Sequence, residues 1–320
     1  MRRRLILGAL VATALAGAAH GQAWPTRQPI RLISPFPPGS AVDAVARPVF
    51  DHVSRQIGQA IVFESRPGAG GTIGMAAVAK AEPDGYTLLV NSSTHTVTPA
   101  TRSNLGFEMS DLAAVIPLGN MPVVMIFNPS KGYKTLGDFV TYAKANPGKI
   151  NYASAGAGNS SHLNGERFRL AAGVEAVHLP FKGAPEATTE VIAGRADFYF
   201  SPLVNALPLI KDGTVQALAV SGSARASALP DVPTTVEAGY PNSEYNFWVG
   251  MFAPAKTPAA IREKLFQEMA KALQAPATHA RLANLGADPM LLNPAQFEAL
   301  VKSEIETNTQ LVKAAGIKVN

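Results

Sequence analysis

Two glycine-rich loops are the segments of this sequence best suited to bind a small ligand. They are residues 35–43 (PFPPGSAVD) and residues 154–162 (SAGAGNSSH). Each loop follows a short apolar run typical of a strand and precedes a helical pattern. Such a loop leaves free backbone N–H groups at a helix N-terminus, where anions bind. We therefore expect two similar half-sites that face one cleft and suit a small acidic molecule.

The beginning of the chain has the pattern of a secretory signal peptide. Residues 2–4 are arginines, residues 5–19 are apolar, and small and polar residues follow as far as Ala23. Cleavage after Gly21 and cleavage after Ala23 both suit this pattern. No later segment approaches about 20 uninterrupted apolar residues, the length that spans a bilayer. We therefore expect residues 1–23 to be removed and the mature protein to be periplasmic.

The composition favours a packed globular protein over a disordered or nucleic-acid-binding one. Of the 320 residues, 47% are hydrophobic and 16% are charged, which suits two domains with apolar cores. The chain has no cysteine, and this excludes disulfides and thiolate chemistry. Its formal net charge of +5 falls to +2 once the three signal arginines are removed. So small a charge argues against a nucleic-acid partner.

Strand and helix patterns alternate through most of the chain. This alternation predicts open, mainly parallel sheets with helices on both faces. Ligands bind such sheets at the carboxyl ends of the strands, where both loops fall. The expected strands are residues 30–34, 61–64, 86–91, 123–127, 150–154, 196–200 and 215–221, and the expected helices are residues 42–56, 72–81, 136–145, 161–172 and 185–193.

The last part of the chain predicts a return to the first sheet. After residue 258 only helical patterns occur, and residues 247–253 form the strand that leads back. We expect the crossings near residues 121–124 and 245–249 to form a hinge between the domains. The expected domains are residues 24–123 with 247–320, and residues 124–246; the expected C-terminal helices are 259–273, 276–285 and 294–314.

A series of further motifs resembles a known family. The series comprises residues 35–39 (PFPPG) with Asp43, 66–71 (RPGAGG) with Gly74, 83–88 (PDGYTL), 154–162 with Leu163 and Glu166, 178–183 (HLPFKG), Arg225, 229–234 (LPDVPT), 237–239 (EAG) and 248–250 (WVG). In this order the chain is similar to the periplasmic substrate-binding proteins of tripartite tricarboxylate transporters, the Bug or TctC family.

The resemblance implies a fold, a function and a set of partners. The fold is α/β, with two domains that close like a Venus flytrap, each a mainly parallel sheet flanked by helices, joined by two crossing strands. The function is capture of a small carboxylate for the membrane permease subunits of a tripartite transporter. In the family both loops hold the carboxylate through backbone amides and water. Here Ser40, Ala41 and Val42 replace a glycine, a small residue and a threonine, so position 42 lacks a hydroxyl.

The residues expected to bind the ligand lie in the two loops and at two further strand ends. They are Phe36, Pro38, Gly39, Ser40, Ala41, Asp43, Ser92, Thr94, Ser154, Ala155, Gly156, Ala157, Gly158, Ser160, His162, Ser201 and Pro202.

Several of these residues also suit a structural role. Asp43 has the spacing of a helix capping box with Ser40, and its charge favours water between it and an anionic ligand. Phe36 suits burial under its loop, and His162 suits capping or packing. Ser92 and Thr94 suit turn hydrogen bonds, the glycines suit turns with positive φ, and Pro202 suits a helix start.

Pro48 is a local conflict, because it falls inside the helix expected at residues 42–56. Proline there removes a backbone donor and crowds the preceding turn. We expect a bend or a restart of the helix at this position.

The sequence favours a receptor over an enzyme. It has no Gly-x-Ser-x-Gly or His-Glu-x-x-His motif, and its six histidines are scattered. We therefore expect no catalytic residues, no metal and no cofactor. A ligand-binding co-receptor for a sensor kinase and a secreted hydrolase are the alternative functions. Citrate and other di- or tricarboxylates, acidic amino acids and aromatic acids all remain open as ligands.

Overall fold

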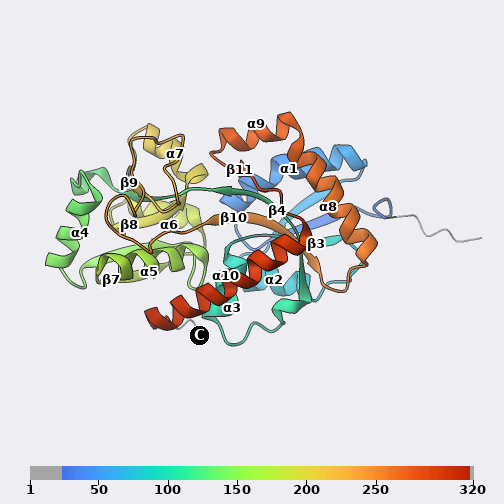
Figure 1. Ribbon diagram of the computed structural model, residues 1–320, viewed down its shortest axis with the longest axis horizontal. Coiled ribbons are helices and arrows are strands. Elements are labelled where there is room, and N and C mark those ends of the chain that lie inside the picture. The colour runs from blue at the N-terminus through green and yellow to red at the C-terminus, as the bar shows by residue number, and fades with distance from the viewer. Residues whose placement is uncertain (1–23, 318–320) are drawn as a thin grey trace, which may run out of the picture.

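The computed structural model describes residues 24–317, which form two α/β lobes (Figure 1). Each lobe has one central sheet flanked by helices, so the α/β, two-lobed architecture expected from the sequence is confirmed. The signal peptide expected at residues 1–23 lies outside the described residues. Within residues 24–317, no helix combines the length and the apolar character needed to cross a bilayer.

The first sheet has six strands in the order β11-β4-β10-β3-β1-β2. Its strands are β1 (Ile30–Ser34), β2 (Ile61–Ser65), β3 (Thr87–Ser92), β4 (Leu112–Met121), β10 (Phe247–Pro254) and β11 (Asp288–Pro289). Its helices are α1 (Ala41–Ile57), α2 (Thr72–Ala79), α3 (Thr94–Thr101), α8 (Ala259–Gln274), α9 (Pro276–Asn284) and α10 (Pro294–Ala315).

The second sheet has five strands in the order β7-β6-β8-β5-β9. Its strands are β5 (Val123–Phe127), β6 (Ile150–Ser154), β7 (Ala176–Pro180), β8 (Phe198–Pro202) and β9 (Gln216–Val220). Its helices are α4 (Leu136–Ala145), α5 (Ser160–Ala172), α6 (Ala184–Ile192) and α7 (Leu203–Lys211).

Both sheets are mixed, and this corrects the expectation of mainly parallel sheets. Parallel pairing joins β1 to β2 and β3 in the first lobe, and β6 to β7 and β8 in the second. The strands next to the crossings run the other way. Strand β10 is antiparallel to β3 and β4, and β5 is antiparallel to β8 and β9. Each sheet therefore reverses direction where the chain enters or leaves the lobe.

Two segments carry the chain between the lobes, as Figure 1 shows. Strand β4 ends at Met121 and β5 begins at Val123, so the outgoing crossing is at Pro122, one residue before the expected boundary. The returning segment lies beside it, because Ser221 N–H donates to the Val123 carbonyl at 2.8 Å and Tyr245 N–H donates to the Ser221 carbonyl at 2.6 Å. We propose that the lobes divide at Pro122 and between β9 and β10.

Helix α1 runs without interruption through Pro48, so the expected restart does not occur. Its inward face is fully buried and includes Val45, Val49 and Phe50. Burial of such side chains stabilises the fold by about 1.5–3 kcal/mol each, which outweighs the cost of about 3 kcal/mol for an interior proline. The helix is capped at its start by Ser40.

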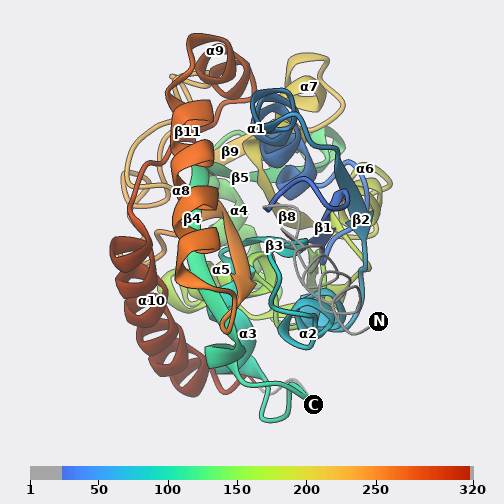
Figure 2. The same cartoon turned by 90° about the vertical axis from the view of Figure 1, so that its right-hand side faces the viewer.

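The C-terminal helices complete the first lobe and reach toward the second. Helix α8 packs on β4 and on α1 (Figure 2). Helix α10 packs along α3 and β4 and also contacts α5 of the second lobe. Trp248 Nε1 donates to Glu304 Oε2 at 3.0 Å, which ties α10 to strand β10. Burial raises the pKa of Glu304.

Candidate ligand-binding site

The first glycine-rich loop connects β1 to α1 and is closed by its own polar side chains. Ser40 Oγ accepts a hydrogen bond from Asp43 N–H at 3.3 Å. Asp43 Oδ2 accepts from Gly39 N–H at 3.3 Å, and Asp43 Oδ1 lies 2.9 Å from Arg47. Asp43 therefore caps the helix and pairs with a cation, although its cap bond goes to Gly39 rather than to Ser40.

The second loop connects β6 to α5 in a similar way. Asn159 Oδ1 accepts from His162 N–H at 3.0 Å and from Ser161 Oγ at 2.9 Å. Ser161 Oγ in turn accepts from Ala155 N–H at 2.9 Å. The start of α5 is thereby held against the loop that precedes it.

Two stacked histidines form hydrogen bonds to the second loop. The ring centroids of His162 and His178 are 3.8 Å apart, and the two rings are stacked nearly parallel. His162 Nδ1 accepts from Gly158 N–H at 3.1 Å, and Ser154 Oγ lies 2.6 Å from His178 Nε2. Burial lowers the pKa of His162 to about 4 and that of His178 to about 3. Both rings are neutral at pH 7 and have a packing role here, the structural alternative noted above for His162.

Three backbone amides at the helix starts are available to a ligand. Ala41 and Val42 begin α1, and Ser161 is the second residue of α5. Their N–H groups have no hydrogen-bond partner in the described part of the chain. Amides in the first turn cannot bond within their own helix, and they carry the positive end of its dipole. These three groups together suit a negatively charged group.

The lobes are in direct contact across the space between these helix starts. Thr94 Oγ1 on α3 donates to Ser160 Oγ at 3.1 Å and accepts from Ser160 N–H at 3.2 Å. Asn205 Nδ2 on α7 donates to the Gly39 carbonyl at 2.9 Å. Arg102 donates to the Ala157 carbonyl at 3.1 Å. The structure therefore shows the lobes in a closed arrangement.

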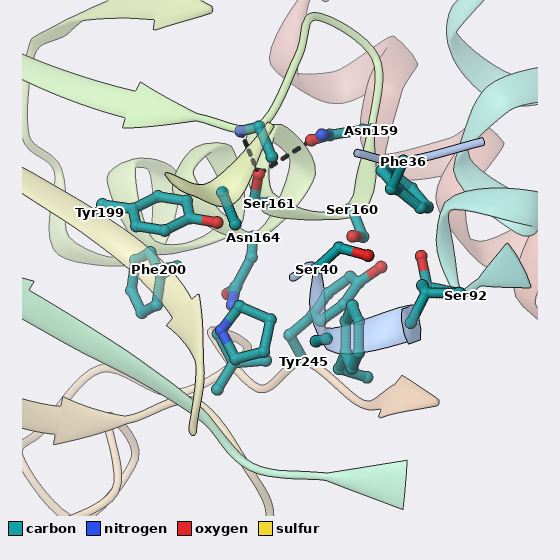
Figure 3. A pocket seen from close by; sticks show the side chains of 17 residues that line it. Phe36, Ser40, Ser92, Asn159, Ser160, Ser161, Asn164, Tyr199, Phe200 and Tyr245 are labelled. Atoms are coloured by element: carbon teal, nitrogen blue, oxygen red, sulfur yellow. Dashed lines mark hydrogen bonds between the residues drawn. The ribbon is translucent and has the colours of Figure 1, made fainter. Parts of the chain in front are cut away.

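A pocket lies between the closed lobes (Figure 3). Its wall combines helix starts from both lobes with aromatic side chains from the second sheet and the returning segment. The lining residues are Phe36, Ser40, Ala41, Val42, Ser92, Val123, Ala155, Asn159, Ser160, Ser161, Asn164, Ala184, Tyr199, Phe200, Pro202, Tyr245 and Phe247.

Some of the residues predicted from the sequence line this pocket, and others lie outside its wall. Those in the wall are Phe36, Ser40, Ala41, Ser92, Ala155, Ser160 and Pro202. Those outside the wall are Pro38, Gly39, Asp43, Thr94, Ser154, Gly156, Ala157, Gly158, His162 and Ser201. Pro38 and Gly39 are exposed on the loop, while Ser201 is fully buried and its hydroxyl faces the Pro202 carbonyl. Gly156 and Ala157 line a neighbouring groove together with Gly68–Gly71 and Lys182.

Other lining residues were not predicted. They are Val42, Val123, Asn159, Ser161, Asn164, Ala184, Tyr199, Phe200, Tyr245 and Phe247. Asn164 follows Ser160 by four residues on α5, so helical periodicity alone could have placed it on the same face. Tyr199 and Phe200 lie on β8, which ends two residues later than expected. Tyr245 and Phe247 belong to the returning segment, and no sequence pattern marks them as part of a site.

The protein has two α/β lobes that are joined by two crossing segments and that enclose a pocket. This architecture defines a two-lobed solute-binding receptor. The model of the tripartite tricarboxylate transporter family receptor matches residues 45–317, and the chain belongs to this family.

Named relatives agree with this assignment over nearly their whole length. Protein BugT of Bordetella pertussis is 33% identical over 320 residues, which cover 98% of this chain and 97% of BugT. The structure of the periplasmic binding protein BugD has a TM-score of 0.87 at 32% identity and covers 91% of this chain and 99% of BugD. MatC from Rhodopseudomonas palustris, solved with bound malate, has a TM-score of 0.84 at 31% identity and covers 90% and 99% of the two chains. The family predicted from the motifs is confirmed, and its members are periplasmic solute-binding receptors.

Proposed function

We propose that this chain captures a small carboxylate between its lobes in the periplasm and delivers it to the membrane subunits of a tripartite tricarboxylate-type transporter. The observation that carries the proposal is the meeting of unpartnered amides from both lobes at one pocket. Family membership supports the transport role, and the malate bound to MatC supports a carboxylate ligand.

The carboxylate binds at the polar side of the pocket. The amides of Ala41 and Val42 approach it from the first lobe, and the amide of Ser161 approaches from the second. The hydroxyls of Ser40 and Ser160 lie at the same helix starts. Because Asp43 is paired with Arg47, its charge is partly compensated, and bridging water can separate it from the ligand.

Closure follows from the same contacts. A ligand held by amides of both lobes makes more hydrogen bonds in the closed arrangement than in an open one, so it shifts the equilibrium toward closure. The ligand is retained and released intact, because the role of the site is binding. A secreted hydrolase would instead turn the acid over.

The test removes one amide without disturbing the helix. Ala41→Pro deletes the N–H at the first position of α1, where proline is well tolerated, and the extended backbone of Ser40 (ψ 160°) suits a residue that precedes proline. Ala259→Pro makes the same change at the exposed start of α8 and serves as the control. Calorimetry against a panel of organic acids should show affinity reduced about tenfold or more by Ala41→Pro and unchanged by Ala259→Pro. Equal affinity in both variants would count against the amide site.

A second experiment separates transport from sensing. Cells that carry the membrane subunits of the transporter should take up the bound acid only when the receptor is present, and the acid should be recovered chemically unchanged. Loss of a transcriptional response without loss of uptake would favour the co-receptor function instead.

A further inference from the structure

The pocket has two sides of different chemistry. Figure 3 shows Ser40, Ser92 and Ser160 together on one side, beside Phe36 and Tyr245, and it shows Tyr199, Phe200 and Asn164 on the other. The first side holds the hydroxyls and helix starts to which we assign the carboxylate. The second side contacts the part of the ligand remote from the carboxylate, so its side chains determine the ligand specificity.

No charged side chain lies in the pocket wall among the described residues. Two arginines on the surrounding helices make contacts outside the wall: Arg47 pairs with Asp43, and Arg167 donates to the Glu244 carbonyl at 2.9 Å. A second carboxylate or an ammonium group of the ligand would be buried without a counter-charge. Burial of an unpaired charge is far more costly than burial of a neutral polar group.

The second side is mostly apolar and aromatic. Tyr199 and Phe200 are each 1% exposed, and Val123 and Phe247 complete the wall near the crossing segments. Aromatic and aliphatic walls of this kind bind a flat or aliphatic apolar body. Burial raises the pKa of Tyr199, so its hydroxyl stays protonated.

One polar group on this side lacks a partner. Asn164 is 1% exposed, and its Nδ2 donates to Ser221 Oγ at 2.9 Å. Ser221 Oγ in turn donates to the Val123 carbonyl at 3.4 Å, so the carboxamide is held in place from behind. Asn164 Oδ1 is buried in the pocket wall and accepts no hydrogen bond from the described residues. A buried acceptor without a donor is costly, so a ligand that supplies the donor gains affinity.

We infer that the ligand is a monocarboxylate with an uncharged, largely apolar body and one hydrogen-bond donor, such as a hydroxyl, which binds Asn164 Oδ1 at the end remote from the carboxylate. This inference rests on the proposed function, since it takes the carboxylate to lie at the helix starts. It makes Asn164 the residue that distinguishes a hydroxy acid from its unsubstituted parent and from a dicarboxylate.

The test compares acids that differ only at the remote end. One series is hexanoate, 6-hydroxyhexanoate and adipate, and the other is benzoate, 4-hydroxybenzoate and terephthalate. Calorimetry on the mature protein should show, in the series whose length fits, about tenfold tighter binding of the hydroxy acid than of the unsubstituted acid. The dicarboxylate should bind at least about a hundredfold more weakly than the hydroxy acid.

Two variants assign the preference to Asn164. Asn164→Leu keeps a side chain of similar size and removes the acceptor, so it should abolish the preference for the hydroxy acid over the unsubstituted acid. Ser221→Ala leaves the pocket wall unchanged but frees the carboxamide, and it should reduce the preference in part. Circular dichroism and thermal unfolding show whether each variant is folded, and Ser221→Ala retains the test if Asn164→Leu is not.

The outcomes separate this inference from the proposed function. A dicarboxylate that binds as tightly as the hydroxy acid, or a hydroxyl preference that survives in Asn164→Leu, overturns the inference and leaves a carboxylate receptor standing. Absence of binding by every acid in both series overturns the inference, and binding of another carboxylate from the panel of organic acids described above would then still support the proposed function.

Discussion

The contact between Thr94 and Ser160 provides the sharpest test of closure. Thr94 is fully buried at the start of α3, and its hydroxyl makes two hydrogen bonds to Ser160 across the lobe boundary. Thr94→Val has nearly the same shape but cannot make either bond. The variant also loses the bond that Ser92 Oγ donates to Thr94 Oγ1 at 3.0 Å, which lies within the first lobe.

The size of the effect follows from these bonds. A neutral hydrogen bond contributes about 0.5–1.5 kcal/mol net, so the two bonds across the boundary contribute about 2 kcal/mol to the closed arrangement. In an open arrangement water satisfies Ser160, whereas in the closed variant its amide is left buried without a partner. The open-to-closed equilibrium should therefore shift by about thirtyfold. For a receptor that is mainly open before the ligand binds, the apparent Kd of the ligand should rise by the same factor.

Calorimetry measures the affinity, and small-angle scattering measures the compaction on ligand binding. Thr98→Val is the matched control, because Thr98 lies on the same helix, is also buried, and donates only to the Thr94 carbonyl within α3 at 2.8 Å. Thr98→Val should leave Kd within about twofold. The reasoning is refuted if Thr94→Val changes Kd by less than threefold, or if the two variants weaken binding equally.

Three further predictions address the rest of the site. Asn205→Leu removes the 2.9 Å bond to the Gly39 carbonyl, a second contact between the lobes, and calorimetry should show about fivefold weaker binding with unchanged thermal stability. Gly74→Ala places a Cβ 2.8 Å from Pro35 Cα, so urea unfolding should show a loss of about 1–3 kcal/mol. Burial lowers the pKa of His162 to about 4 and that of His178 to about 3, whereas histidine in the unfolded chain has a pKa near 6.5. Between about pH 6.5 and about pH 4 the unfolded chain therefore binds more protons than the folded protein. The free energy of unfolding should accordingly fall as the pH drops through this range, by up to about 1.4 kcal/mol per pH unit for each histidine. Replacing His178 with glutamine should flatten that dependence.

The sequence predicts the regular elements well wherever hydrophobic periodicity is undisturbed. Strands β1 and β5 and helix α4 begin and end where the pattern places them. Strand β4 was not predicted, because Pro117 and Gly119 interrupt its apolar run. The register of β10 shifts opposite this segment, between Val249 and Gly250. The irregular pairing with β10 accommodates the proline and the glycine, which are residues that local propensity disfavours in a strand.

Helix α1 shows the opposite error, where local propensity was given too much weight. Local rules alone predict a bend or a restart at Pro48; the restart does not occur, because the buried face of the helix keeps it continuous. Strand direction was also beyond local rules. Whether β5 and β10 run parallel or antiparallel to their neighbours depends on where each crossing segment enters its sheet. The five to eight residues of the strand itself do not encode this direction.

The two sides of the pocket differ in how well the sequence predicts them. The first side, to which we assign the carboxylate, is formed largely by backbone amides. A strand, a loop of small residues and a helix are enough to expose such amides. Position 42 illustrates this, because valine lacks the hydroxyl of threonine and yet its amide remains unpartnered in the pocket wall. The loop motif can therefore be shared by receptors of different ligands.

The remote side depends on side chains that come together only in the folded protein. Asn164 lies on α5, and Tyr199 and Phe200 lie on β8. Each can be replaced without loss of the amides to which we assign the carboxylate, so we expect affinity for the acid group and choice of the ligand body to change independently. Substitution of Asn164 should accordingly alter which acid binds, whereas Ala41→Pro should weaken every acid alike.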